Sequence, residues 1–220
     1  YALAPATSCF LIPKNISFEE AATIPLAAMT AALGLCKRMD LPPPWRPAIS
    51  PIPLIIYGGA GAVGSLAIKL AQASNIHPIL AVAGHSKNMS NRSLIEIRAI
   101  VSSTADLQVT HAYDAVTDHG SWNILSQVLA PSGHMVLVLP FGDFVILEKI
   151  SQFINQQSRV YSDRAQPLRL VIRILARFFR LFEKGLRDGW FTPHPFETIP
   201  GGLDGVEKQQ LEFKVQVRNM

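Results

Sequence analysis

Cysteine is scarce in this sequence. The 220 residues include two cysteines, Cys9 and Cys36, which lie far apart and form neither a CxxC pair nor a cluster with histidine. No bound metal is predicted, because structural zinc sites need closely spaced Cys and His ligands. The same scarcity fits a reducing compartment, and we expect a cytoplasmic protein.

Long apolar runs and a targeting segment are also missing. The longest apolar run, residues 134–147, is interrupted by Pro140, Gly142 and Asp143. It is too short and too broken to span a bilayer, so membrane association is not expected. No basic segment followed by an apolar one is present at the start, so no signal peptide is predicted. Because the first residue is Tyr1 rather than Met, we expect the sequence to begin inside a longer reading frame.

A strong charge of either sign is absent as well. The net charge is +4, and no basic stretch is interleaved with aromatic residues. Nucleic-acid binding is therefore not predicted. Apolar residues are plentiful, at 49% of the chain, so a sizeable core can be buried. The length suits one full domain, or one domain and part of a second.

Local signals organise the first part of the chain. Ser17 and Glu20 have the spacing of a capping box and predict a helical run, which Pro25 restarts and which continues to Leu35. Residues 41–53 are rich in proline, so neither a helix nor a central strand can cross them.

A strand–turn–helix–strand pattern follows. Residues 54–57 predict a buried strand, residues 58–64 a Gly-rich turn, residues 65–74 a helix and residues 78–83 a second strand. The alternation continues with helices predicted at 91–100, 122–129 and 168–187, and strands at 99–102, 111–116, 135–139 and 211–217. We therefore predict an α/β fold with a Rossmann-type, doubly wound parallel sheet.

The Gly-rich turn carries the main functional signal. It matches GxGxxG directly after a strand and at the start of a helix, in the residues Gly59, Ala60, Gly61, Ala62, Val63 and Gly64. In such a motif Gly59 permits the tight turn, Gly61 lets the backbone approach a pyrophosphate, and Gly64 lets the helix pack close to the strand. The alternative is a Gly-rich turn without a ligand. A Walker A loop is excluded, because Ser65 stands where its lysine would be.

The end of the second strand predicts the type of nicotinamide cofactor. NAD-binding proteins usually place Asp or Glu there to accept from the ribose 2′-hydroxyl. This sequence has no acid at that point, whereas Ser86 and Lys87 suit a 2′-phosphate, with Arg92 one turn later. NADP(H) is therefore the predicted cofactor. The alternative for Lys87 is a solvated loop residue.

Several stretches resemble the zinc-independent medium-chain dehydrogenase/reductase superfamily, and most closely its fungal enoyl reductases that act in trans with polyketide synthases. The similar stretches are residues 12–35 (IPKNISFEEAATIPLAAMTAALGL), 57–71 (YGGAGAVGSLAIKLA), 113–116, 120–122, 137–140 and 185–202 (GLRDGWFTPHPFETIPGG). The resemblance implies hydride transfer from NADPH to an α,β-unsaturated thioester or ketone. A polyketide synthase carrier domain is the implied protein partner.

The resemblance also assigns residues and domains. Leu139 and Pro140 would lie beside the nicotinamide, and Thr30 would face the nicotinamide or the substrate. The alternative for Thr30 is a helix-interior threonine bonded to its own backbone. Residues 1–16 correspond to the end of an N-terminal, GroES-like catalytic domain that is otherwise missing. Residues 17–200 correspond to the Rossmann domain, and residues 201–220 to a segment returning towards the N-terminal domain.

The sequence leaves other functions open. Hydride transfer needs no protein nucleophile, so no catalytic residue is assigned. Asp114 and Asp118 are candidates by residue type, with loop capping as the alternative. A short-chain dehydrogenase is excluded, because no tyrosine is followed four residues later by lysine. The chain is alternatively a truncated, inactive cofactor-binding or interaction module. The basic helix 168–182 alternatively binds a membrane or a partner, or covers the sheet with a solvated Arg face.

Overall fold

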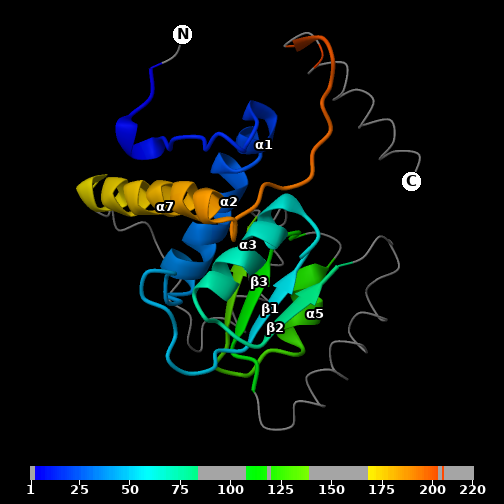
Figure 1. Cartoon of the computed structure of the whole chain (residues 1–220). Coiled ribbons are helices and arrows are strands. Elements are labelled where there is room, and N and C mark those ends of the chain that lie inside the picture. Colours follow the sequence, from blue (N-terminus) through cyan, green and yellow to red (C-terminus); the bar gives the residue numbers. More distant parts are fainter. Residues whose placement is uncertain (1–2, 84–107, 118–119, 139–167, 203–204, 206–220) are drawn as a thin grey trace.

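Four short parallel strands form the centre of the computed structural model, which describes residues 3–83, 108–117, 120–138, 168–202 and 205. The strands are β1 (Leu54–Tyr57), β2 (Ile79–Val82), β3 (His111–Asp114) and β4 (His134–Leu137). Their order across the sheet is β2-β1-β3-β4, with Leu54 in register with Ile79 and with His111 (Figure 1). The chain passes from β1 to β2 on one side of β1, and β3 and β4 then lie on its other side. The sheet is therefore doubly wound, which confirms the predicted fold class.

Helices cover both faces of the sheet. The helical elements are η1 (Ala6–Ser8), α1 (Phe18–Ala22), α2 (Pro25–Ala32), η2 (Leu33–Arg38), α3 (Ala62–Ala73), α5 (Ser121–Ser126) and α7 (Leu168–Asp188). On one face, Leu54 and Ile56 pack into a core shared with α2, α3 and α7. On the other, Ile55 and Ala112 pack against α5. Residues 54–56 are therefore apolar without alternation, because β1 is buried on both faces.

The N-terminal helices follow their local sequence signals. The Ser17 hydroxyl accepts from the Glu20 amide at 3.1 Å, and the Glu20 carboxylate accepts from the Ser17 amide at 2.8 Å. This confirms the predicted capping box. Pro25 begins α2 as its first residue, where its missing N–H costs nothing. The helix continues past the predicted end at Leu35 as the π-helical turn η2, in which the Met39 amide donates to the Gly34 carbonyl at 3.0 Å.

The Pro-rich residues 41–53 form neither helix nor strand, as predicted. Backbone hydrogen bonds nevertheless fix them to the corner between α3 and β2. The Ala48 amide donates to the Ser74 carbonyl at 2.8 Å, and the Ile52 amide donates to the His77 carbonyl at 2.8 Å. The Asn75 side chain donates to the Ala48 carbonyl at 2.8 Å.

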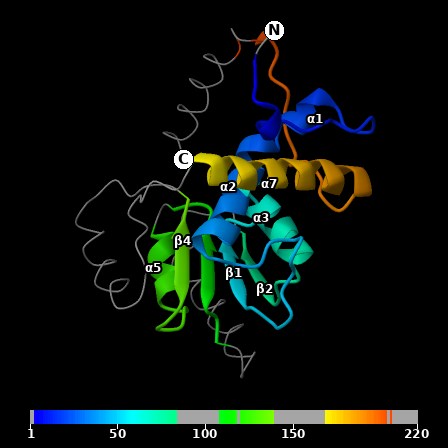
Figure 2. The same ribbon diagram turned by 90° about the vertical axis from the view of Figure 1, so that its left-hand side faces the viewer.

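Helix α7 spans Leu168–Asp188, within one residue of the prediction, and crosses over α2 (Figures 1 and 2). Phe178, Phe182 and Leu186 are buried in the core, whereas Arg173 and Arg177 are exposed. From Phe178 onward the apolar face of the helix is thus covered by the protein itself, as the alternative with a solvated Arg face predicted, whereas Ile172 is exposed. Its main neighbours are α2 and the N-terminal segment, so it does not lie directly on the sheet.

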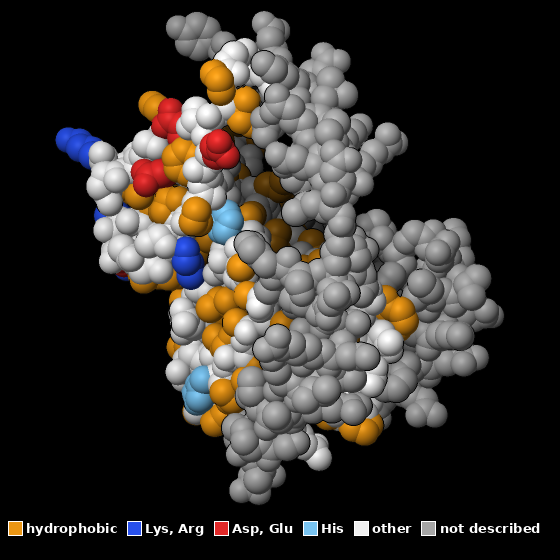
Figure 3. Space-filling model, turned by 90° about the vertical axis from the view of Figure 1, so that its right-hand side faces the viewer, with side chains coloured by type: hydrophobic (Ala, Val, Ile, Leu, Met, Phe, Trp, Pro, Cys, Tyr) orange, Lys and Arg blue, Asp and Glu red, His pale blue; other side chains and the backbone are white. Residues whose placement is uncertain are grey.

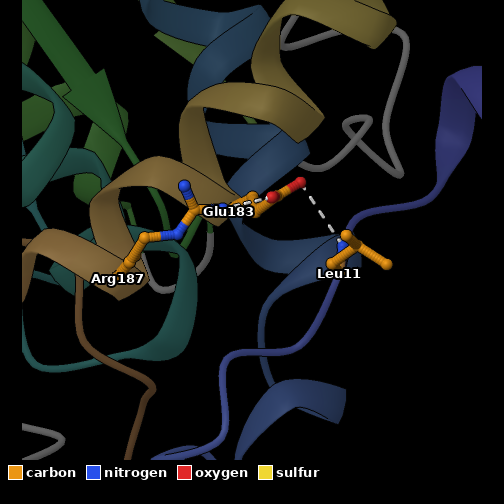
Figure 4. A network of polar contacts seen from close by, with 3 residues as sticks. All are labelled: Leu11, Glu183 and Arg187. Atoms are coloured by element: carbon orange, nitrogen blue, oxygen red, sulfur yellow. Dashed lines mark hydrogen bonds and ion pairs between the residues drawn. The ribbon is translucent and has the colours of Figure 1, made fainter.

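The N-terminal segment lies along α7. The rings of Phe10 and Phe179 have centroids 6.1 Å apart. The Leu11 amide donates to the Glu183 carboxylate at 3.5 Å, and Glu183 also pairs with Arg187 at 2.5 Å (Figure 4). Residues 172 positions apart in the chain are therefore held together.

On the face shown in Figure 3, apolar side chains are spread over the described surface and acidic ones gather in its upper part. No helix among the described residues is long and apolar enough to cross a membrane. The same residues contain no group of three or more His, Cys, Asp or Glu placed to hold a metal. The elements predicted at 91–102 and 211–217 lie outside the described residues.

Candidate functional site

The Gly-rich turn lies at the carboxyl end of β1, between β1 and α3. At this edge of the sheet the chain leaves β1 towards β2 on one side, while β3 lies on the other side. Tyr57 and Asp114 are register partners and end β1 and β3. Ligands of open α/β sheets bind at such a switch point, in the crevice beyond the carboxyl ends of the strands.

Gly58 and Gly59 make the turn. Both amides donate to the Val82 carbonyl at 2.9 Å. The left-handed residue is Gly58, with φ +82°, one position earlier than the predicted Gly59. A Cβ on Gly59 would lie 3.2 Å from side-chain carbons of Ala81 and Ile68, so packing against β2 explains this glycine. The tight turn itself depends on Gly58.

Gly64 has the role that the motif predicts. A Cβ at this position would overlap the carbonyl group of Gly58, so α3 could not lie this close to the end of β1. Gly64 is buried, and its neighbour Leu66 is fully buried in the core. Close packing of helix and strand therefore requires glycine here.

Gly61 is not required by the protein's own packing. It is exposed, its φ of −74° and ψ of 166° suit any residue, and a Cβ would meet only the Gly58 oxygen at 3.4 Å. It is the N-cap of α3, and no side chain caps the helix there. Because α3 begins at Ala62, earlier than predicted, the amides of Ala62 and Val63 belong to its first turn and have no acceptor within the helix. These amides and the positive end of the helix dipole can bind an anion.

Asp114 is fully buried at the end of β3 and caps the loop that follows. One carboxylate oxygen accepts from the amides of Val116 at 3.0 Å and Thr117 at 2.8 Å. The other accepts from the buried Ser121 hydroxyl at 2.5 Å. Burial, and secondly the charge of Asp114, raise the pKa of Tyr57. Among the described residues, all hydrogen bonds of this carboxylate cap the loop and the helix that follow β3, in agreement with the alternative of loop capping. Asp118 lies outside the described residues.

A second segment meets α3 near its start, which the sequence did not predict. The Ser65 hydroxyl and Nδ1 of His194 are hydrogen bonded at 3.0 Å. One turn later, the Lys69 ammonium donates to the Thr192 carbonyl at 2.8 Å and hydroxyl at 2.7 Å. Burial lowers the pKa of Lys69. The only sequence signal was that residues 185–202 belong to a stretch with family resemblance.

Thr30 lies on α2, and its hydroxyl donates to the Leu26 carbonyl at 2.8 Å. This is the backbone-bonded arrangement given as the alternative to a substrate contact. The Thr30 carbonyl accepts from the Tyr113 hydroxyl at 3.2 Å, which ties α2 to β3. Burial raises the pKa of Tyr113. The other predicted cofactor contacts, Ser86, Lys87, Leu139 and Pro140, lie outside the described residues.

Comparison with known proteins gives relatives but no family model, since none matches this chain. The trans-enoyl reductase fsr4 of Gibberella fujikuroi is 32% identical over 226 residues, covering 93% of this chain and 64% of the relative. The chain thus spans less than two thirds of that relative's length.

Solved structures show the fold. An alcohol dehydrogenase superfamily protein from Novosphingobium aromaticivorans matches with a TM-score of 0.60 and 20% identity, over 84% of this chain and 56% of that one. The quinone oxidoreductase of Escherichia coli, complexed with NADPH, matches with a TM-score of 0.54 and 17% identity, over 82% and 57%. The described part of the chain has the Rossmann-type fold of this superfamily.

Proposed function

We propose that this chain, a homologue of trans-enoyl reductases, binds NADP(H) and serves an NADPH-dependent reduction of an activated C=C bond. The observation that carries the proposal is the uncapped start of α3, where the described residues leave open the space beside Gly61. A dinucleotide pyrophosphate fits this arrangement, because it needs exposed amides and a backbone without a side chain in the way.

The described residues offer donors for a pyrophosphate. The amides of Ala62 and Val63 would donate to the phosphate oxygens, with Gly61 at the point of closest approach and Ala60 exposed beside it. The NADPH bound to the quinone oxidoreductase of Escherichia coli supports a nicotinamide cofactor. Contacts of Ser86 and Lys87 with the 2′-phosphate, and of Leu139 and Pro140 with the nicotinamide, stay predictions.

The cofactor supplies a hydride when bound, and the protein binds and orients it. Homology to trans-enoyl reductases supports an α,β-unsaturated thioester or ketone as the substrate. A polyketide synthase carrier domain as the donor of that substrate, a contact with Thr30 and a cytoplasmic location stay predictions. So do the assignments of residues 1–16 and 201–220 to a second domain and of residues 17–200 to the Rossmann domain.

The alternative is a cofactor-binding module without catalysis. Both functions require the same cofactor site, and they differ in whether NADPH is consumed when an enoyl thioester is added. Membrane binding through α7 is not supported, because its apolar face is buried in the core.

Titration of the purified chain with NADPH, followed by nucleotide fluorescence and calorimetry, tests the proposal. We expect saturable binding of one nucleotide per chain. No binding would overturn the proposal. Loss of NADPH absorbance on adding a short 2-enoyl thioester would then separate the reductase from the inactive module.

A further inference from the structure

A cleft lies away from the Gly-rich turn, between the Pro-rich residues 41–50 and helix α7. Its volume is about 590 Å³, and its lining includes Leu41, Ile52, Ile174 and Phe178. Phe178 is buried, and its ring centroid lies 5.0 Å from that of Trp45. Most of the residues that line this cleft are apolar.

The wall formed by the Pro-rich loop is fixed in place. The Arg46 amide closes a turn onto the Pro43 carbonyl at 2.8 Å, and the Ala48 amide is bonded to Ser74. Prolines at positions 42, 43 and 47 restrict the backbone further. A preformed cleft costs little conformational entropy on binding, which favours its use as a docking site.

Apolar side chains are exposed at the same place. Ile49 lines the cleft and is fully exposed, and 45% of Trp45 is exposed. Exposed apolar residues that gather beside a concavity mark interaction sites more often than singly scattered ones do. Trp and Arg are also the residue types that dominate binding energy in protein interfaces.

Cations border the cleft. Arg46 lines it from the loop, and Arg177 and Arg173 lie on the exposed stripe of α7 next to the cleft-lining Ile174, as about 100° per residue requires. Arg180 continues this stripe. Lys37 and one carboxylate, Asp40, also line the cleft. Within the described residues, no ion pair joins Arg46, Arg173, Arg177 or Arg180 to an acid.

Helix stability does not explain these arginines. The first acidic residue of α7 is Glu183. In the C-terminal half of the helix, ion pairs join Glu183 to Arg187 and Asp188 to Lys184. Cations in the N-terminal half face the positive end of the helix dipole, where acids are favoured. The stripe therefore offers positive charge to another molecule.

We propose that this cleft docks an acidic amphipathic helix of a partner protein. The apolar stripe of such a helix would fill the cleft against Trp45, Ile49 and Ile174, while its carboxylates meet Arg46, Arg173 and Arg177. A protein helix fits better than a membrane surface, because the exposed apolar residues line a concavity and the apolar face of α7 is buried in the core. None of the residues that line the cleft is a predicted NADP(H) contact.

A synthetic peptide tests the proposal. The probe is a labelled helix of about 18 residues with Leu at i, i+3, i+4 and i+7 and Glu elsewhere, followed by fluorescence anisotropy at about 50 mM salt. We expect saturable binding that the double variant Arg173→Glu/Arg177→Glu weakens by about tenfold or more. Lys14→Glu reverses one exposed cation away from the cleft and is the matched control for Arg177→Glu alone; it should leave binding within about twofold.

Two further measurements locate the contact. Amide exchange should slow in residues 43–50 and 172–178 when the peptide binds, and Ile49→Asp should weaken binding. A peptide of the same composition with scrambled Leu positions that bound equally well would overturn the proposal, since charge alone would then suffice. The proposal would also be overturned if Lys14→Glu lost as much peptide affinity as the arginine variant. Binding of anionic lipid vesicles without binding of the peptide would overturn it as well.

Discussion

The hydroxyl of Ser65 and Nδ1 of His194 lie 3.0 Å apart, although 129 positions separate the two residues. The His194 amide also donates to the Thr23 hydroxyl at 3.2 Å, and this hydroxyl donates to the Glu20 carbonyl. His194 therefore joins the first turn of α3 to the end of α1, beside the turn that we propose to hold the cofactor.

Replacing His194→Ala removes the ring contact with Ser65 but keeps the backbone bond to Thr23. We expect the free energy of unfolding to fall by about 1 kcal/mol, the usual net value of one hydrogen bond. Urea unfolding measures this change. His77→Ala is the control, because the hydrogen bond of its ring within the described residues is local, to the Asn75 carbonyl. An equal loss in both variants would mean that the His194 bridge has no special stabilising role.

Gly61→Val and Gly64→Val should separate ligand binding from folding. A side chain at position 61 has room in the protein, so Gly61→Val should remain folded yet lose NADPH binding by tenfold or more, about 1.4 kcal/mol. A side chain at position 64 collides with the Gly58 carbonyl, so Gly64→Val should lower stability by several kcal/mol. Nucleotide titration and thermal unfolding distinguish the two effects. Binding retained in Gly61→Val would show that the turn does not hold the phosphates.

NADPH should bind this chain more tightly than NADH. The reason is the lack of an acid after the second strand and the presence of Lys87, whose ammonium suits a 2′-phosphate. Titration with both nucleotides measures the ratio, and Lys87→Ala should reduce it. Equal affinities of the unmodified chain for NADPH and NADH would show that Lys87 does not select the 2′-phosphate.

How far the sequence predicts this fold depends on how local each signal is. The apolar run 54–57, the Gly-rich turn and the capping box of Ser17 each depend on residues that lie close together in the sequence. The strand and the capping box formed as predicted, whereas the left-handed residue of the turn is Gly58 instead of Gly59. The start of α3 was placed three residues late, because Gly61 caps the helix inside the motif.

Contacts between segments that are distant in the chain could not be predicted from the sequence. A side chain on Gly34 would overlap the ring of Tyr113, so the close approach of η2 to β3 requires this glycine. The small residues of the helical run indicate close packing but not its partner. In the same way, nothing in the sequence pairs Lys69 with Thr192 or encloses a cleft between Trp45 and α7.

Asp114 should be structural rather than catalytic. Asp114→Ala leaves two amides and the buried Ser121 hydroxyl without their acceptor, which should lower the free energy of unfolding by about 3 kcal/mol. Asp114→Asn keeps one oxygen acceptor and should lose less. Chemical unfolding of both variants checks the order. Unchanged stability together with lost NADPH binding would instead place this carboxylate at the ligand.

Cys36 should make stability fall at alkaline pH. Burial raises the pKa of its thiol from 9.0 to about 12, so the unfolded chain ionises first as the pH rises above 9. The unfolded state then binds fewer protons than the folded state, and stability declines by about 1.4 kcal/mol at about pH 10. Tyr57 and Tyr113 add a decline of the same sign at higher pH.

Urea unfolding of the unmodified chain and of Cys36→Ala, at about pH 8 and about pH 10, tests this linkage. The variant should lose less stability between the two values. Cys9→Ala, which alters an exposed thiol, is the matched control and should behave like the unmodified chain. An identical pH dependence in all three proteins would contradict the assignment to Cys36.

The bond from Leu11 to Glu183 bears on the order in which the molecule assembles. It closes a loop of 172 residues, so the N-terminal segment finds its place only after α7 has docked onto α2. This segment is synthesised before α7, and the docked segment is held weakly, since Leu3 and Leu11 stay exposed to solvent in the folded structure. We therefore expect it to dock late and to detach early, ahead of the central sheet.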